Sequence, residues 1–476
     1  MKKKILICGN FNIVHSGHIR IFEFAKKMNA KLIVGVFCDR IARKKVFIHE
    51  KQRLECVRSN SFVDEVYLIN TSLKKFILKI KPNILLKGQE FEKSNNPELK
   101  YLDKIGAKLI FGSGSTNYSS LEMVSNEFIN QDYGRLIHEN EYLKRHQITA
   151  KNLINITKKF NKLQVAVIGD SIIDEYISTN PIGMSREDTT IVVTPIGNNL
   201  FVGGSAIVAA HAASLGAKSS LFTINGKDKY NKFLEKKLKN YNVDRNIFID
   251  ETRNTNLKKR YRAPEKTLLR VNLYEQRKIS KKIQDKILKK IKKISSKINL
   301  LVFSDFNFGC LPPELVKNIL NHIKKRKIFV AADSQTSSQI GNIGKFKNVN
   351  LITPTEHEAR VELKDFTSGM VKISLDLIKQ TRTNNLILTL NKDGVLIQGG
   401  SQNNWKTEKL PSLCKLAKDP AGCGDAFFIT SSMAMSCGSS LWEAAYLGSI
   451  AAGLQAQFLG NTPVSLSRIK KEINNI

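Results

Sequence analysis

The sequence predicts an α/β protein of two doubly wound units joined by a helical connector. Short apolar runs alternate with amphipathic stretches across residues 1–133 and again across 163–476, and buried parallel strands read as apolar runs of this kind. Residues 134–162 are polar, charged and without strand patterns, which favours a helical connector. A length of 476 residues suits two or three domains.

Composition indicates a folded protein, because 42% of the residues are hydrophobic and 25% are charged. The net charge is +34, from 76 Lys and Arg against 42 Asp and Glu. These cations are scattered along helical stretches, so we interpret them as solvated helix faces and expect no specific nucleic-acid partner. The chain shows no long apolar run, no secretory leader pattern and no paired CxxC among its seven cysteines, which together predict a cytoplasmic protein without a membrane partner.

In the first unit, five apolar runs mark the expected strands: residues 4–8, 31–37, 65–69, 84–86 and 108–111. In the second unit the expected strands are 164–170, 220–224, 300–303, 328–332, 350–353 and 385–390. Residues 253–275 alternate between polar and apolar side chains, which predicts antiparallel strands forming a small β lid beside the main sheet.

The first candidate site follows the first strand. His15 and His18 are three residues apart at the start of an expected helix, so they share one face. A helix N-terminus offers backbone N–H groups and a positive dipole end, and two imidazoles beside it suit a phosphate that gains charge during transfer. Gly17 permits close approach of that phosphate to the backbone. Two ordinary histidines at a helix start are the alternative.

This stretch resembles the HxGH motif of the cytidylyltransferase-like nucleotidyltransferases. An E-x-x-R run at 50–53, a K-G pair at 87–88 and an S-T-N loop at 115–117 agree with that family in order. The resemblance implies catalysis by His15 and His18, which would stabilise the α-phosphate. It implies nucleotide and phosphate contacts from Gly9, Phe11, Gly17, Lys44 (or Lys45), Lys87, Ser115 and Thr116. Asn12 stands where the family often has Asp, which weakens any magnesium role there.

The second candidate site is the run from Asp419 to Asp425 before a long apolar helix. Gly422 and Gly424, on either side of Cys423, free the backbone so that successive N–H groups can form an anion nest. Asp425 lies in the first helical turn, where a carboxylate can take a proton from a substrate hydroxyl. Positioning, charge neutralisation and a base are what phosphoryl transfer needs. A Gly-rich turn with a stabilising Asp is the alternative.

The second unit resembles the ribokinase-like (PfkB) sugar kinases. Their ordered elements match at 169–174, 203–204, 353–358, 389–394 and 419–425. The resemblance implies a catalytic Asp425, sugar contacts from Asp174, Gly203 and Gly204, and an indirect magnesium role for Glu358. It implies nucleotide or phosphate contacts from Thr389, Gly394, Gly422, Cys423 and Gly424.

Some positions depart from the family pattern. Thr355 replaces the Asn of an N-x-x-E element, and Ile207 replaces an Asn that usually reaches a sugar hydroxyl. We expect the acidic pair Glu187 and Asp188 to line the sugar cleft.

Arg260 and Arg262 lie on the expected lid, where guanidinium groups could bind a substrate phosphate by paired hydrogen bonds. Solvated charges on an edge strand are the alternative.

The combination resembles the bifunctional heptose-7-phosphate kinase and heptose-1-phosphate adenylyltransferases of lipopolysaccharide precursor synthesis, with the domain order reversed. Phe308 stands where those enzymes have Lys. The resemblance implies Mg²⁺ as cofactor, ATP as substrate with CTP as an option at the transferase site, a sugar phosphate as partner, and a homodimer through the kinase lid. A polyol-phosphate cytidylyltransferase fused to an unlinked sugar kinase and a non-catalytic basic binding protein are the alternatives.

Overall fold

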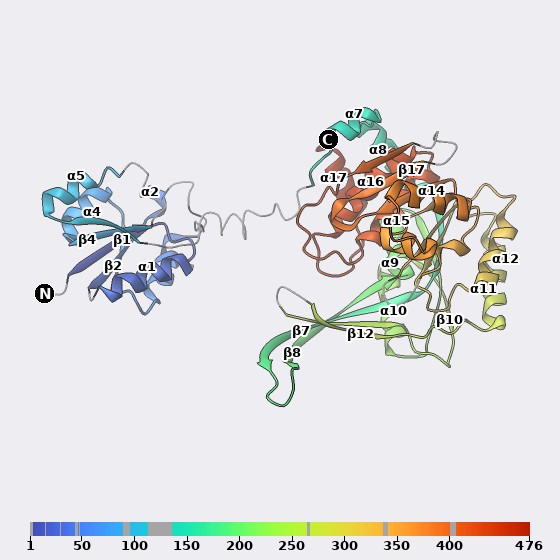
Figure 1. Ribbon diagram of the computed structural model, residues 1–476, viewed down its shortest axis with the longest axis horizontal. Helices are drawn as coiled ribbons and strands as arrows, with labels where there is room; N and C mark the ends of the chain where they lie inside the picture. The colour runs from blue at the N-terminus through green and yellow to red at the C-terminus, as the bar shows by residue number, and fades with distance from the viewer. Residues whose placement is uncertain are drawn as a thin grey trace. The chain divides into compact units, whose positions relative to one another are not determined.

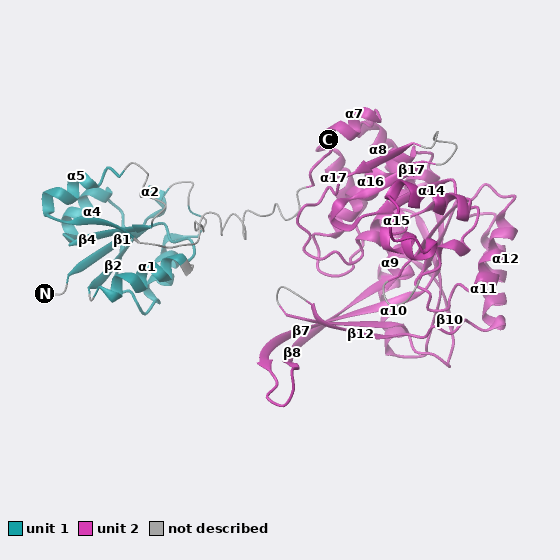
Figure 2. Ribbon diagram, in the orientation of Figure 1, with its two compact units in different colours: residues 1–132 teal, residues 133–476 magenta. Residues whose placement is uncertain are grey.

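The computed structural model divides the chain into two compact units, residues 1–132 and 133–476 (Figures 1 and 2). It describes residues 3–14, 16–28, 30–42, 46, 48–88, 96–112, 136–263, 267–336, 341–399 and 406–476. Each unit has its own sheet and its own apolar core, so the predicted α/β class with two sheet-based units is confirmed.

The first unit is a parallel sheet of five strands in the order β3-β2-β1-β4-β5. Its strands are β1 (Lys4–Gly9), β2 (Lys31–Phe37), β3 (Glu65–Ile69), β4 (Ile84–Gly88) and β5 (Lys108–Gly112). Side chains alternate across β1, because Ile5 and Ile7 belong to the core of one face and Leu6 to that of the other. The helices include α1 (Ser16–Lys27), α2 (Asp39–Ala42), α3 (Glu50–Arg58), α4 (Leu73–Ile80) and α5 (Leu99–Leu102).

The second unit is built on a nine-stranded sheet in the order β10-β9-β6-β13-β14-β15-β16-β17-β18. All neighbouring strands from β10 to β16 pair in parallel. β17 pairs antiparallel with both β16 and β18. The strands are β6 (Gln164–Gly169), β9 (Lys218–Asn225), β10 (Asp244–Ile249), β13 (Leu300–Asp305), β14 (Phe329–Ser334), β15 (Leu351–Ile352), β16 (Asn385–Thr389), β17 (Val395–Gly399) and β18 (Thr407–Leu410).

Helices cover both faces of this sheet (Figure 1). Val165 and Val167 of β6 pack into one core, whereas Ala166 and Ile168 pack into the other. The first core is covered by α9 (Ser205–Ser214), α10 (Lys229–Asn240), α15 (Cys423–Ser436), α16 (Leu441–Gln455) and α17 (Leu466–Ile473), and the second by α11 (Lys281–Ile294), α12 (Pro313–Ile323), α13 (Glu356–Leu363) and α14 (Met370–Thr381). Among the described residues, no helix has both the length and the apolar character of a membrane span.

A separate four-stranded sheet, the lid, has the order β12-β11-β7-β8. The predicted antiparallel pair is present as β11 (Leu257–Arg262) and β12 (Thr267–Leu273). The other pair, β7 (Ser171–Met184) and β8 (Ile191–Gly204), was not predicted from the sequence, and its long hairpin extends away from the rest of this unit (Figure 1).

The helices expected as a connector pack onto the second unit. These are α7 (Asn140–Arg145) and α8 (Ala150–Lys158), which place Tyr142, Leu143 and Leu153 in its core. The Tyr142 hydroxyl donates to the carbonyl of Trp442 on α16 at 2.9 Å. Apolar side chains on one helical face therefore make this segment part of the second unit.

Candidate functional site

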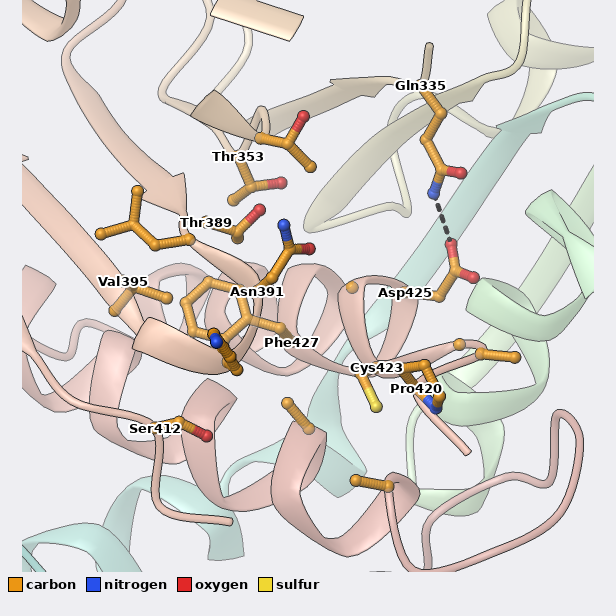
Figure 3. Close-up of a pocket in the computed structure, with 18 of the residues that line it drawn as sticks. Gln335, Thr353, Thr389, Asn391, Val395, Ser412, Pro420, Cys423, Asp425 and Phe427 are labelled. Atoms are coloured by element: carbon orange, nitrogen blue, oxygen red, sulfur yellow. Dashed lines mark hydrogen bonds between the residues drawn. The ribbon is translucent and has the colours of Figure 1, made fainter. Parts of the chain in front are cut away.

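One cavity of about 1010 Å³ lies in the second unit (Figure 3). The carboxyl ends of β14, β15 and β16 reach it with Asp333, Thr353 and Thr389. The lid reaches it with Asp174 from β7 and with residues of β11, and the first turn of α15 completes the wall. The cavity therefore lies where parallel α/β sheets bind ligands, at the carboxyl ends of the strands.

The start of α15 supplies the anion nest and the acid. Gly422 has φ 77°, and a Cβ there would lie 2.4 Å from Oδ1 of Asn461, so only glycine suits the position. Gly422, Cys423 and Gly424 all line the cavity. Burial raises the pKa of the Cys423 thiol to about 12, so this side chain stays protonated at neutral pH.

Asp425 is buried at the cavity wall and accepts a hydrogen bond from Nε2 of Gln335 at 3.4 Å (Figure 3). Burial and, to a smaller extent, the charge of Asp174 raise the pKa of Asp425, the Lys258 ammonium opposes both, and the resulting pKa is about 7. A carboxyl group that titrates near neutral pH can both hold and release a proton there, which is what a general base requires.

Asp174 lies across the cavity on β7. Its carboxylate accepts from Nδ2 of Asn461 at 3.1 Å and pairs with Arg260 at 3.4 Å, while burial raises its pKa. A Cβ at Gly203 would lie 2.4 Å from Oδ2 of Asp174, so glycine is needed for this approach. Gly204, with φ 62°, also lines the cavity.

The two lid arginines differ. Arg260 lines the cavity, whereas Arg262 is not among the lining residues and pairs with Asp419 at 3.3 Å. Both guanidinium groups lie over the ring of Tyr176, at 5.5 and 5.2 Å from its centre. Because β11 has a strand on each side, neither arginine is on an edge strand.

Thr389 and Gly394 line another part of the same cavity. The backbone N–H of Thr389 donates to the carbonyl of Pro354 at 2.9 Å. Gly394 has φ 92°, and a Cβ there would lie 2.1 Å from the carbonyl oxygen of Leu410. Asn391, Val395 and Ser412 lie beside them (Figure 3).

Glu358 is buried at the start of α13. Its two carboxylate oxygens accept the backbone N–H groups of Thr336 at 2.8 Å and Thr355 at 2.7 Å. Thr355, the replacement for Asn, caps the helix and accepts the N–H of Glu358. Burial, together with the charges of Glu358 and Asp425, holds the pKa of Asp333 well above its usual range.

One sequence expectation does not match the lining, and two positions that depart from the family pattern are buried in the protein. Glu187 and Asp188 are exposed at the tip of the β7–β8 hairpin, because strands of 14 residues carry that turn away from the cleft. Ile207 is fully buried in the core on α9 and does not reach the cavity. Phe308 is buried against Phe306 and Tyr274.

Sequence reasoning also missed Lys258, Asp333 and Gln335, which all line the cavity. Lys258 had a signal, since it shares the alternating pattern of Arg260 and Arg262 on β11. Asp333 and Gln335 had only their place at the end of an apolar run.

In the first unit, the structure describes part of the expected site. Phe11 is buried with φ 49°, and its ring lies 4.9 Å from that of His18, centre to centre. Gly9 ends β1 and Gly17 lies in the first turn of α1. The expected site residues His15, Lys44, Ser115 and Thr116 lie outside the described residues.

Lys87, the last residue but one of β4, has two polar partners. Its ammonium donates to Oδ1 of Asn96 at 2.7 Å and forms an ion pair with the buried Glu98. Part of the positive charge expected to meet phosphate is thus balanced within the protein.

The E-x-x-R run places Arg53 entirely inside the first unit. Its guanidinium donates to the carbonyls of Asn10 and Phe37 and to Asp39, so it ties the segments after β1 and β2 together. This arrangement fixes the backbone around the expected nucleotide site.

A glycine-rich helix start, a buried carboxyl titrating near neutral pH and lid residues in the same cavity are arranged as phosphoryl transfer requires. A family model described as pfkB family carbohydrate kinase matches residues 162–466, and one described as cytidylyltransferase-like matches residues 6–108. The chain belongs to the pfkB carbohydrate kinase family, and its first unit is cytidylyltransferase-like.

Curated relatives include the bifunctional protein HldE of Sulfurimonas denitrificans, 30% identical over 327 residues, covering 67% of this chain and 65% of the relative. The bifunctional protein HldE of Geotalea uraniireducens is 24% identical over 330 residues, with 68% and 66% covered. The chain thus covers just under two thirds of each relative.

Solved structures support the fold of the second unit. A ribokinase from Thermotoga maritima matches with a TM-score of 0.53 and 18% identity, over 66% of this chain and all of that one (100%). Phosphofructokinase-2 from Escherichia coli matches with a TM-score of 0.54 and 15% identity, over 66% and 99%.

Proposed function

We propose that this protein is a bifunctional enzyme of nucleotide-sugar precursor synthesis. Its second unit would phosphorylate a heptose 7-phosphate-like sugar at the anomeric hydroxyl with ATP. Its first unit would transfer an adenylyl group to a sugar 1-phosphate. The observation that carries the proposal is Asp425, a buried carboxyl with a pKa of about 7 at the wall of a cavity beside a glycine-rich helix start.

In the kinase reaction, Asp425 takes the proton of the sugar hydroxyl while the oxygen attacks the γ-phosphorus of ATP. The bond from that phosphorus to the bridging oxygen breaks, and ADP leaves with the electron pair. The N–H groups at the start of α15 stabilise the charge on the phosphates. Thr389, Gly394 and their neighbours contact the nucleotide.

Magnesium suits this cavity. Mg²⁺ keeps several waters and binds through substrate phosphates with one or two carboxylates, so it needs no closed ligand cage. No His, Cys, Asp and Glu cluster of that closed kind occurs in the part of the chain that the structure describes. Asp333 is crowded by two other acids and would gain from a nearby cation, and Glu358, whose oxygens hold backbone N–H groups, would act through water. When bound, the metal would neutralise phosphate charge.

The sugar would carry a phosphate at its far end. Arg260 is the lid arginine that lines the cavity, and a guanidinium group suits phosphate because two parallel hydrogen bonds add geometry to charge. The kinase product would be a bisphosphate, so another enzyme would remove the distal phosphate before nucleotidyl transfer.

For the first unit, the proposal rests on its match to the cytidylyltransferase-like family and on His18 at the start of α1. His15 and His18 would stabilise the α-phosphate, and pyrophosphate would leave. The relatives named bifunctional protein HldE favour one chain with two activities. ATP is the proposed donor, with CTP as the alternative.

We further propose a homodimer through the lid. Large apolar side chains on β7, β8 and β12 are exposed, including Ile182 at 67%, Ile196 at 73% and Leu269 at 56%. Sedimentation at micromolar concentration should give twice the monomer mass, and Ile182→Lys with Ile196→Lys should return the protein to the monomer.

The enzymatic proposal is tested with the purified full chain. ADP release should require a sugar and should be fastest with a sugar 7-phosphate, whereas pyrophosphate release should require a sugar 1-phosphate. ADP release with no preference among sugars would remove the heptose assignment, and no pyrophosphate release with either ATP or CTP would remove the transferase.

A further inference from the structure

The connector reaches the wall of the cavity from behind. Leu136 is 3% exposed and belongs to the same apolar core as the buried side chains of α16. It fills the space beside Gly453 of α16, since a Cβ on that glycine would lie 2.5 Å from Cδ2 of Leu136. Gly453 lines the cavity, whereas Leu136 is not among the lining residues. The side chain of Leu136 therefore supports the wall without facing the cavity.

The next residue of the connector bonds to the wall directly. The backbone N–H of Ile137 donates to the carbonyl of Leu413 at 2.8 Å. Leu413 is almost fully buried, lines the cavity and shares its apolar core with Leu136. It belongs to the 411–422 segment, which joins β18 to α15 and lines the cavity along most of its length. The bond from Ile137 thus fixes the connector to this segment.

The 411–422 segment adjoins the part of the cavity that we propose for the nucleotide. A Cβ on Gly394 would lie 2.6 Å from the backbone nitrogen of Ser412, so the two backbones are in close approach. Further along, the segment is held by α16 and its C-cap, because the N–H of Lys418 donates to the carbonyl of Ala456 at 2.8 Å. The connector therefore acts on the half of the segment that lies nearer to β18 and to the nucleotide.

Helix α7 holds the connector in place on two sides. Arg145 and His146 both contact the carboxylate of Glu408 on β18. The ring of His146 stacks on that of Trp442 at the start of α16, with centres 4.4 Å apart and planes at 12°. The connector thus bridges β18 and α16, the two elements to which the 411–422 segment is attached. A bridge of this kind limits how far the ends of the segment can move apart.

We propose that Leu136 and Ile137 position the 411–422 segment and so set the affinity of the kinase site for ATP. They are positioning residues, because they contact the wall and do not line the cavity. Loss of either contact lets the wall relax away from the nucleotide, which weakens ATP binding equally in the ground state and the transition state. The inference rests on the proposed kinase reaction, and it depends neither on the identity of the sugar nor on the transferase.

The test compares two pairs of variants of the full chain. Leu136→Ala is matched by Leu153→Ala, because Leu153 of α8 is buried in the same core and does not line the cavity. Ile137→Pro removes the N–H that donates to Leu413. Its control is Ile137→Ala, which keeps that N–H and shortens a side chain that is 41% exposed. Thermal melting establishes that each variant is folded.

Leu136→Ala and Ile137→Pro should raise the KM for ATP by about tenfold, with kcat and the KM of the acceptor nearly unchanged. Calorimetry with ATP and Mg²⁺ in the absence of an acceptor should show the same loss of affinity. Leu153→Ala and Ile137→Ala should lower thermal stability at most and leave both ATP constants at their wild-type values.

Equal effects on ATP in test and control variants, no effect in either, or a loss confined to kcat overturns the positioning role and leaves the proposed kinase standing. If Leu136→Ala does not fold, the Ile137 pair decides. A wild type that binds ATP but transfers phosphate to no acceptor contradicts the proposed kinase, and the calorimetric comparison then still tests the positioning role by itself.

Discussion

Replacing Asp425 with Asn should separate catalysis from stability. Asn cannot take up a proton as a carboxylate does, so the variant loses the general base. Asn has nearly the volume of Asp, and its side-chain oxygen can still accept the hydrogen bond from Gln335. General-base loss lowers a rate by a factor on the order of 10² to 10⁴, so we expect that loss in kcat for sugar phosphorylation. ATP binding should persist, because the glycine-rich helix start is unchanged.

The stability change has the opposite sign. The pKa of Asp425 is raised from 3.8 to about 7, so the folded protein disfavours the charge that the unfolded chain acquires above pH 4. The free energy of unfolding therefore falls as pH rises from about 4 to about 7. Integrated over that window, the buried carboxyl costs roughly 4 kcal/mol at pH 7 as an upper estimate, a cost that Asn does not carry.

The assays are ADP release and chemical denaturation at pH 4 and pH 7. Asp425→Asn should be less active, more stable than wild type at pH 7, and equal to it near pH 4. A variant with wild-type turnover would show that Asp425 only begins a helix. A variant that is less stable at pH 7 would refute the argument from burial.

Four further results are expected. His18→Ala should abolish pyrophosphate release while ADP release persists, and loss of both without unfolding would contradict two separate sites. Excess EDTA should stop both reactions, and full activity under EDTA would exclude the proposed metal. Arg260→Ala should lower kcat/KM for a sugar 7-phosphate more than for the free sugar, whereas Arg262→Ala, whose partner is Asp419, should alter selectivity less; equal effects would remove the phosphate-reading lid. His211 is buried with its pKa lowered to about 3, and its Nδ1 accepts the N–H of Val464, so the folded state loses stability as pH falls below about 6.5, by about 2 kcal/mol at pH 5. Unfolding of His211→Asn should not show that loss between pH 7 and pH 5, and an unchanged pH dependence would assign the effect elsewhere.

The parallel strands could be predicted because their burial leaves a direct trace in the sequence. Runs such as residues 32–37 contain no polar side chain, since both faces of the sheet are covered. The β7–β8 hairpin leaves no such trace, because much of its length is exposed and burial does not select its residues. Because the length of this hairpin was not predicted, Glu187 and Asp188 at its tip were expected in the cleft.

The site could be predicted where backbone geometry dictates the residue type. Gly203, Gly204, Gly394 and Gly422 have no room for a Cβ, so the glycines mark the site. Lys258 and Gln335 could not be found in this way, since their side chains come near Asp425 only after distant strands pack together. Ile207, which stands at a motif position where an Asn usually reaches the sugar, faces the core.

Electrostatic properties were the least accessible from sequence. Nothing in the order of residues shows that Asp425 would titrate near neutral pH, because that depends on burial and on Asp174 and Lys258 from other strands. Likewise, the ion pair between Lys87 and Glu98 joins two residues 11 positions apart, and no motif in the sequence marks them as partners.

The central claim is that one chain carries a sugar kinase and a nucleotidyltransferase that act on different substrates. Phosphorus NMR of the full chain with Mg²⁺ and ATP tests it directly, first with heptose 7-phosphate and then after addition of heptose 1-phosphate. The account predicts that the first stage yields only an anomeric phosphate on a 1,7-bisphosphate, and that the second yields pyrophosphate with a nucleotide diphosphate ester. Phosphate on another oxygen, or no ester after the second addition, would contradict it.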